Sequence, residues 1–100
     1  MEKQIEYVNH YELSVRGVWG RNRTEKFEVQ RLTSAPRDAA QPEERALTAM
    51  VEVALNGMKL KTGCWQLIRR NVEVERYDGG VKIERFALFT DQTTLATGSR

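Results

Sequence analysis

The sequence predicts a small α+β protein, a two-layer β-β-α-β-β domain in which two hairpins are joined through one helix. Three observations predict it. Apolar and polar side chains alternate through the first strand-like segment, apolar side chains repeat at helical spacing after residue 42, and an Asp-Gly pair follows a later strand-like segment. Because an apolar sheet face must be covered by another layer, we expect a four-stranded antiparallel sheet packed on one central helix.

The first hairpin is predicted by an alternation of period two. Residues 20–24 have turn composition, and the alternation resumes with Phe27 and Val29. Placing Trp19 opposite Phe27 keeps the odd residues of both strands on one face, as a one-sided core requires. The odd positions of the first strand hold Ile5, Tyr7, Tyr11, Leu13, Val15 and Trp19.

The helix is predicted where the period changes. Residues 33–41 contain Pro36 and small polar residues, which indicates a crossover, and Pro42 suits a first helical position. We expect the helix to end at Gly57, because glycine adopts the left-handed conformation without strain, with Gly63 as the alternative end. The expected apolar stripe consists of Ala46, Leu47, Met50, Val53, Ala54 and Met58.

The second hairpin is predicted by the pair Asp78-Gly79, a strong two-residue turn signal between strand-like segments. With these two residues as the loop, Val74 lies opposite Ile83. Beyond residue 91 the chain shows no periodic apolar face. We therefore expect a single domain over residues 1–91 and a flexible C-terminal tail over residues 92–100.

Composition excludes several classes of protein. The 100 residues suffice for one domain, and no apolar run approaches the roughly 20 residues of a membrane-spanning helix. A net charge of +2 is too small for a dense basic field, and a lone cysteine, Cys64, excludes an internal disulfide framework. The first residues mix charges and lack the layout of a secretory signal, so we expect a cytoplasmic protein that does not act at a membrane.

Catalytic chemistry is weakly represented. His10 is the only histidine and falls on the polar face of the first strand, where a surface position is expected. Cys64 has no neighbouring base in the sequence, and the carboxylates of Glu73, Glu75 and Glu84 are expected to be solvated surface charges. The glycines form no phosphate-binding motif. We expect a protein that is not an enzyme and that needs no metal or other cofactor.

One apolar strip stands out near the far end of the second hairpin, where residues at odd and at even positions are both apolar. Continuing the expected pairing places Ile68, Ala87 and Phe89 under the helix and turns the alternate residues outward. Such a strip would bind a partner. A β-bulge near residues 69–71, or burial by the tail around Leu95, would instead hide it. The expected partner-binding residues are Trp65, Leu67, Arg69, Arg70, Phe86 and Leu88.

Arginines near strand ends suggest a second kind of partner. Guanidinium groups interleaved with aromatic rings can hold phosphates and stack on bases. Glutamates share the same surfaces, however, and a mixed face repels phosphates as well as attracting them. Nucleic-acid binding is therefore the alternative interpretation, through Arg16, Arg21, Arg23, Arg69, Arg70 and Arg76.

These observations favour a small non-catalytic protein that docks on a protein or nucleoprotein complex, as an inhibitor or an adaptor. Aromatic residues and arginines of the strip are types enriched at protein interfaces, and they could also support a homodimer. In size, economy of fold and lack of a catalytic set, the chain is similar to the small phage or mobile-element inhibitors of host defence, the anti-CRISPR proteins among them. That similarity implies a phage accessory protein.

Overall fold

The computed structural model describes residues 3–19, 24–77, 80, 82–86 and 92–100, with the backbone alone at residues 3, 77 and 82–86. The predicted α+β class and the order β-β-α-β-β are confirmed, and a further strand follows. The molecule is elongated, with extents of 52 × 28 × 24 Å. Its elements are β1 (Lys3–Trp19), β2 (Lys26–Pro36), α1 (Glu44–Met58), β3 (Leu60–Tyr77), β4 (Lys82–Phe86) and β5 (Gln92–Ser99).

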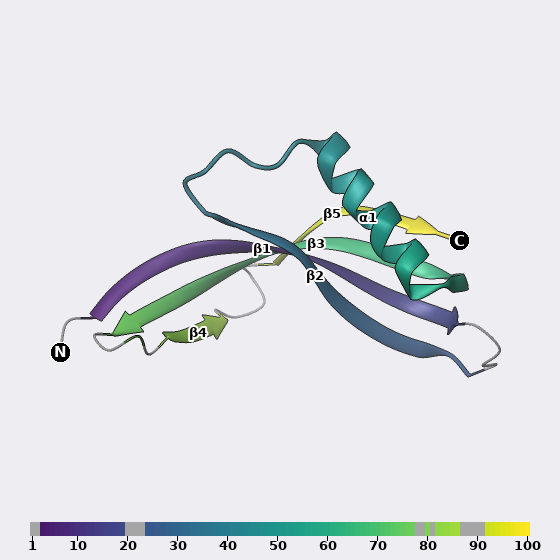
Figure 1. Cartoon of the computed structure of the whole chain (residues 1–100), viewed down its shortest axis with the longest axis horizontal. Coiled ribbons are helices and arrows are strands. Elements are labelled where there is room, and N and C mark those ends of the chain that lie inside the picture. The colour runs from purple at the N-terminus through teal and green to yellow at the C-terminus, as the bar shows by residue number, and fades with distance from the viewer. Residues whose placement is uncertain (1–2, 20–23, 78–79, 81, 87–91) are drawn as a thin grey trace.

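The sheet is antiparallel and is built on two long strands. β1 and β3 pair along almost their whole lengths, β2 lies outside β1, and both β4 and β5 pair with the other edge of β3. In Figure 1, α1 lies over one half of this sheet and β4 lies at the opposite end. The helix within the described part of the chain is not long and apolar enough to span a membrane.

The first hairpin forms with a different register from the one predicted. Phe27 pairs with Arg16 and not with Trp19, so the side chains of β2 face the opposite way. A bulge at Leu32 shifts the register once more, between Tyr11 and Glu12. As a result Phe27 is 63% exposed on the face away from the helix. The prediction that odd residues of both strands share one face is therefore wrong.

The second hairpin is also displaced by one residue. Val74 pairs with Glu84, and Glu75 pairs with Ile83, where the two-residue loop predicted Val74 opposite Ile83. A one-residue shift turns every partner to the other face. Gly80 adopts a positive φ of 84°, which a glycine in a longer hairpin loop supplies without steric cost.

The C-terminal residues form strand β5, so the expectation of a flexible tail is wrong. Gln92–Ser99 pairs with β3 from Arg70 to Cys64, and Leu95 packs against the main core. Two backbone hydrogen bonds between Arg100 and Gly63, of 2.9 and 3.1 Å, continue the pairing to the end of the chain. These threonine-rich residues suit an edge strand, where β-branched side chains need no periodic apolar face.

The helix begins at Glu44 and ends at Met58, so it runs through Gly57, the expected stop. Lys59 takes the left-handed cap position instead, with φ 57° and ψ 39°. The buried stripe also differs from the expected one, because Val53 is 73% exposed. The residues of α1 that are buried are Leu47, Val51, Ala54 and Leu55.

Each of the two long strands changes its buried face along its length. Near α1, odd residues such as Leu13 and Leu67 form the core with the helix. Farther along β3, Val72 and Val74 are 0% and 1% exposed, yet their even positions place them on the opposite face. The sheet therefore has a helix-covered face at one end and a second buried patch on the other face at the other end.

Candidate functional site

The predicted partner-binding strip does not lie on one exposed surface. Leu67 is 3% exposed within the helix-covered core, and Trp65 packs against the same core. Their outward placement is wrong, because the odd residues of this part of β3 face α1, and Ile68 occupies the other face. The side chain of Phe86, and the whole of Leu88, lie outside the described residues. The pairing of β1 with β3 shows no register shift at residues 69–71, so the bulge considered there does not form.

The arginines of the alternative interpretation do not gather into one basic surface. Arg69 and Arg70 point to opposite faces, and Arg69 donates a 2.8 Å hydrogen bond to Gln41. The others that the structure describes lie beside carboxylates, and Arg21 and Arg23 lie outside the described residues. The ion pairs join Arg16 to Glu25 (3.7 Å), Arg70 to Glu12 (3.0 Å) and Arg76 to Glu6 (3.3 Å).

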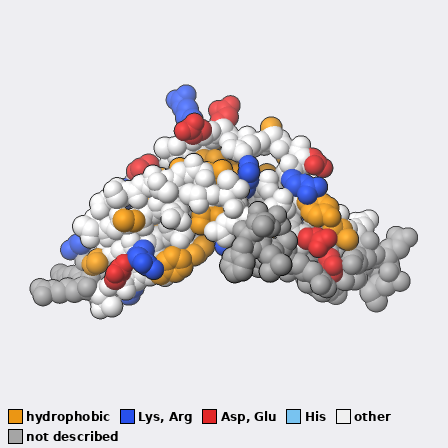
Figure 2. Space-filling view, turned by 180° about the vertical axis from the view of Figure 1, so that it is seen from behind, with side chains coloured by type: hydrophobic (Ala, Val, Ile, Leu, Met, Phe, Trp, Pro, Cys, Tyr) orange, Lys and Arg blue, Asp and Glu red, His pale blue; other side chains and the backbone are white. Residues whose placement is uncertain are grey.

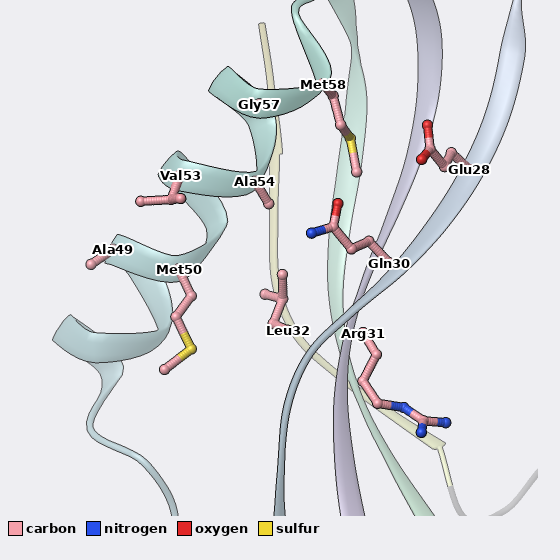
Figure 3. Close-up of a pocket in the computed structure, with 10 residues that line it drawn as sticks. All are labelled: Glu28, Gln30, Arg31, Leu32, Ala49, Met50, Val53, Ala54, Gly57 and Met58. Carbon is pink, nitrogen blue, oxygen red and sulfur yellow. The ribbon is translucent and has the colours of Figure 1, made fainter.

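A groove of about 710 Å³ lies between β2 and α1. It arises because the helix packs its Leu47–Leu55 stripe over β1 and β3, which leaves the flank of the helix facing the outer strand β2. Figure 3 shows the helix on one side of the groove and β2 on the other. The lining residues are Glu28, Gln30, Arg31, Leu32, Ala49, Met50, Val53, Ala54, Gly57 and Met58.

The wall on the helix side is apolar and made of small or flexible residues. Met50 and Met58 extend from the helix toward β2, whereas Val53, which also lines the groove, is drawn on the side of the helix away from β2 (Figure 3). Methionine side chains are unbranched and polarizable, so they adapt to the shape of a bound apolar group. Ala54 and Gly57 leave room between them, since neither has a long side chain. The groove can therefore accept apolar side chains of more than one shape.

The groove is negative at one end. Glu28 extends from β2 at the same end as Met58 (Figure 3), and no described residue forms an ion pair with it. The last turn of α1 itself carries no basic side chain, but Lys59 is its C-cap and Arg100 donates a 2.9 Å hydrogen bond to Asn56 in that turn, so Glu28 supplies the negative charge at this end. A cationic group on a ligand would be favoured at this end.

A second, polar hollow lies on the opposite face of the sheet. It measures about 320 Å³ and is lined in part by His10, Arg31, Ser34 and Arg76. His10 is 3% exposed, with its Nδ1 2.5 Å from Ser34 Oγ, so its expected surface position is wrong. The side chain turns to the predicted polar face, but the neighbouring strands cover it.

Glu12 extends this polar cluster across three strands. The residue is 8% exposed. Its carboxylate lies 3.0 Å from Arg70 Nε and 3.9 Å from Arg31 Nε. The geometry with Arg70 is that of an ion pair and not of a straight hydrogen bond. The sequence offered one signal for this cluster: the even residues of the first strand, His10 and Glu12, share a face.

The remaining candidates for chemistry stay apart. Glu84 pairs with Val74, so it lies on the face opposite Glu73 and Glu75. Glu75 is 4% exposed, so its expected solvated position is wrong. Cys64 is an exposed free thiol on β3, between Arg16 and Ser99. Within the described ranges, no three His, Cys, Asp or Glu side chains gather as a metal site would need.

No family model, curated protein or solved structure matches this chain. Function must therefore be argued from the surfaces of the molecule itself.

Proposed function

We propose that this protein is a non-catalytic docking module that binds an apolar segment of another protein in the groove between β2 and α1. The observation that carries the proposal is the open apolar groove itself. The site of docking differs from the expected strip, since Trp65 and Leu67 serve the core. Inhibitors and adaptors both act by occupying a partner's surface, so either role is compatible with this mode of binding.

The chemistry of the groove defines the partner segment. Val53 at the rim is 73% exposed, and an apolar side chain placed against it would remove both surfaces from water. Glu28 favours a lysine or arginine at the end of the segment nearest Met58. The partner we propose is thus an extended or helical segment with two or more apolar side chains followed or preceded by a basic residue.

Peptide selection tests this proposal. We expect a displayed library of random peptides, panned against the whole chain, to yield apolar sequences that contain a basic residue. Val53→Asp should weaken their binding at least about tenfold, because an ionised carboxylate at the rim opposes apolar contact. Ala46→Asp is the matched control, since Ala46 is exposed on the same helix outside the groove.

Charge reversal tests the end of the groove. In Glu28→Lys, peptides selected on the wild type should lose affinity, and sequences with an acidic residue in place of the basic one should gain it. Peptides whose binding is unaffected by both Val53→Asp and Glu28→Lys would bind elsewhere, and the groove would then not be the docking site.

A further inference from the structure

Strand β2 is a long free edge of the sheet. Among the described residues it pairs only with β1, and residues 26–31 are all exposed. On the face away from α1 it carries Phe27 and Val29, which are 63% and 48% exposed. Figure 2 shows the molecule from behind Figure 1, with hydrophobic side chains surfacing among charged ones.

Such an edge is a template for another strand. Its outward N–H and C=O groups lack partners in the sheet, and natural edges are usually protected by bulges, prolines or short length. In β2 the bulge at Leu32 and the proline at Pro36 both lie beyond residue 31. The stretch from Lys26 to Arg31 is regular and has neither a bulge nor a proline. It is apolar at Phe27 and Val29, and its protection is limited to the charged side chains between and beside them.

We propose that a second copy of this chain pairs its β2 with this β2, antiparallel, about a two-fold axis through Val29. Antiparallel extension of a sheet relates the copies by an axis perpendicular to the sheet, so equivalent faces stay together. In this register each residue meets a partner of the same face, and Val29 lies opposite Val29 of the second copy.

The charges of β2 are complementary to themselves in this register. Phe27 lies opposite Arg31 of the second copy, where a guanidinium can lie over an aromatic ring. Glu25, which is 3.7 Å from Arg16 of its own chain, lies diagonal to the same arginine, which is itself 3.9 Å from Glu12; the dimer would add a third charge to each of these pairs. On the other face, Glu28 lies opposite Gln30, a neutral hydrogen-bonding partner. In this register no two like charges of residues 26–31 lie directly opposite each other.

The neighbouring register with its axis at Glu28 is less favourable. A shift that moves the axis to Glu28 places that carboxylate opposite its own copy, and like charges directly opposite each other destabilise a sheet. A shift by one residue would pair opposite faces, which an axis perpendicular to the sheet does not allow. The axis at Val29 avoids this repulsion and joins the two exposed valines across the new interface.

Dimerisation would change the shape of the groove. Both copies of α1 would lie on the same face, one on each side of the paired β2 strands, because the axis preserves the faces of the sheet. The two grooves would then adjoin over a floor formed by both β2 strands. The inference of a dimer does not depend on the proposed function, because it rests on β2 alone.

Sedimentation equilibrium tests the pairing. We expect the wild-type chain to be a dimer at micromolar to sub-millimolar concentration. Val29→Lys and Val29→Glu should each raise the dimer dissociation constant at least about tenfold, because like charges then meet at the axis. An equimolar mixture of the two variants should dimerise again. Val29 is exposed, and circular dichroism of each variant checks that the fold is retained.

Crosslinking tests the register. In a Cys64→Ser background, Val29→Cys should form a disulfide-linked dimer on mild oxidation, whereas Thr48→Cys on the exposed side of α1 should not. A monomeric wild-type chain would overturn the proposal and leave the β2 edge to a strand of another protein. A dimer that both charged variants leave intact, or that crosslinks equally through residue 48, would also overturn it.

Discussion

Gly98 of β5 lies so close to the indole ring of Trp65 that a Cβ at position 98 would be 2.3 Å from the ring atom Cζ2. The two residues are also cross-strand partners in the sheet. Because Trp65 packs against the core beneath α1, this contact ties the last strand of the chain to the main hydrophobic cluster.

Gly98→Ala should therefore destabilise the protein by about 1–3 kcal/mol, since the ring or the strand must move to admit a methyl group. Urea denaturation followed by tryptophan fluorescence measures the change. Ser99→Ala is a suitable control, because Ser99 is exposed and lies on the same strand. Equal stability of the two variants would contradict the close packing of Gly98 on Trp65.

Leu95 provides an independent test that the C-terminal residues are structural. Its side chain is half-buried against the core, and Leu95→Ala should cost about 1–3 kcal/mol. Thr93→Ala on the same strand is exposed and should change the free energy of unfolding by less than about 0.5 kcal/mol. A flexible tail would instead leave both variants as stable as the wild type.

The ion pair between Glu12 and Arg70 should contribute more than a surface pair. The Glu12 side chain is 11% exposed, and removing Arg70 would leave its buried carboxylate less compensated. We expect a double-mutant cycle with Glu12→Gln and Arg70→Gln to give a coupling free energy of about 1 kcal/mol or more in urea denaturation.

The pair Arg16 and Glu25 is the matched control for that cycle. Its side chains are 71% and 63% exposed at a separation of 3.7 Å, so its coupling should stay below about 0.5 kcal/mol. Raising the salt concentration should weaken the exposed pair further and affect the buried pair less. Similar coupling in both cycles would mean that burial adds nothing to the Glu12 pair.

Two substitutions near the C-terminal end of α1 should stabilise the protein. Gly57 lies inside the helix with open space where a Cβ would go, so Gly57→Ala should stabilise the protein by about 0.5–1 kcal/mol. Lys59→Gly should stabilise it by a similar amount, about 0.5–1 kcal/mol, because Lys59 holds a left-handed conformation that glycine adopts without strain. Thermal unfolding measures both changes. A lower midpoint for Gly57→Ala would indicate that the helix ends before this residue.

The order of the elements was predictable because it rests on local signals. The alternation before Trp19, the stripe around Leu47 and the turn at Asp78 each depend on a few neighbouring residues. β5 was missed because a single apolar residue, Leu95, gives an edge strand no periodicity. Its threonines were the available signal, through their preference for extended backbone.

The registers and the groove were not predictable from such signals. The turn before Glu25 could be one residue longer or shorter and keep the same kind of composition. Each such change in turn length would move all the side chains of the following strand to the other face of the sheet. At Leu67 and Ile68 the sequence is apolar at odd and even positions alike, a pattern that predicted an exposed strip of side chains on one face. In the structure the buried face changes there. The groove depends on where the helix axis lies over the sheet, which no local pattern specifies.

The change of buried face along β1 and β3 restricts how the length of this chain can vary. Both strands pair without interruption from Lys3 opposite Tyr77 as far as Val18 opposite Thr62. One residue added or deleted in the middle of either strand would leave one end in place and turn the side chains of the other end inside out. Related sequences should therefore vary by substitution along these strands and keep their insertions and deletions to the connecting loops.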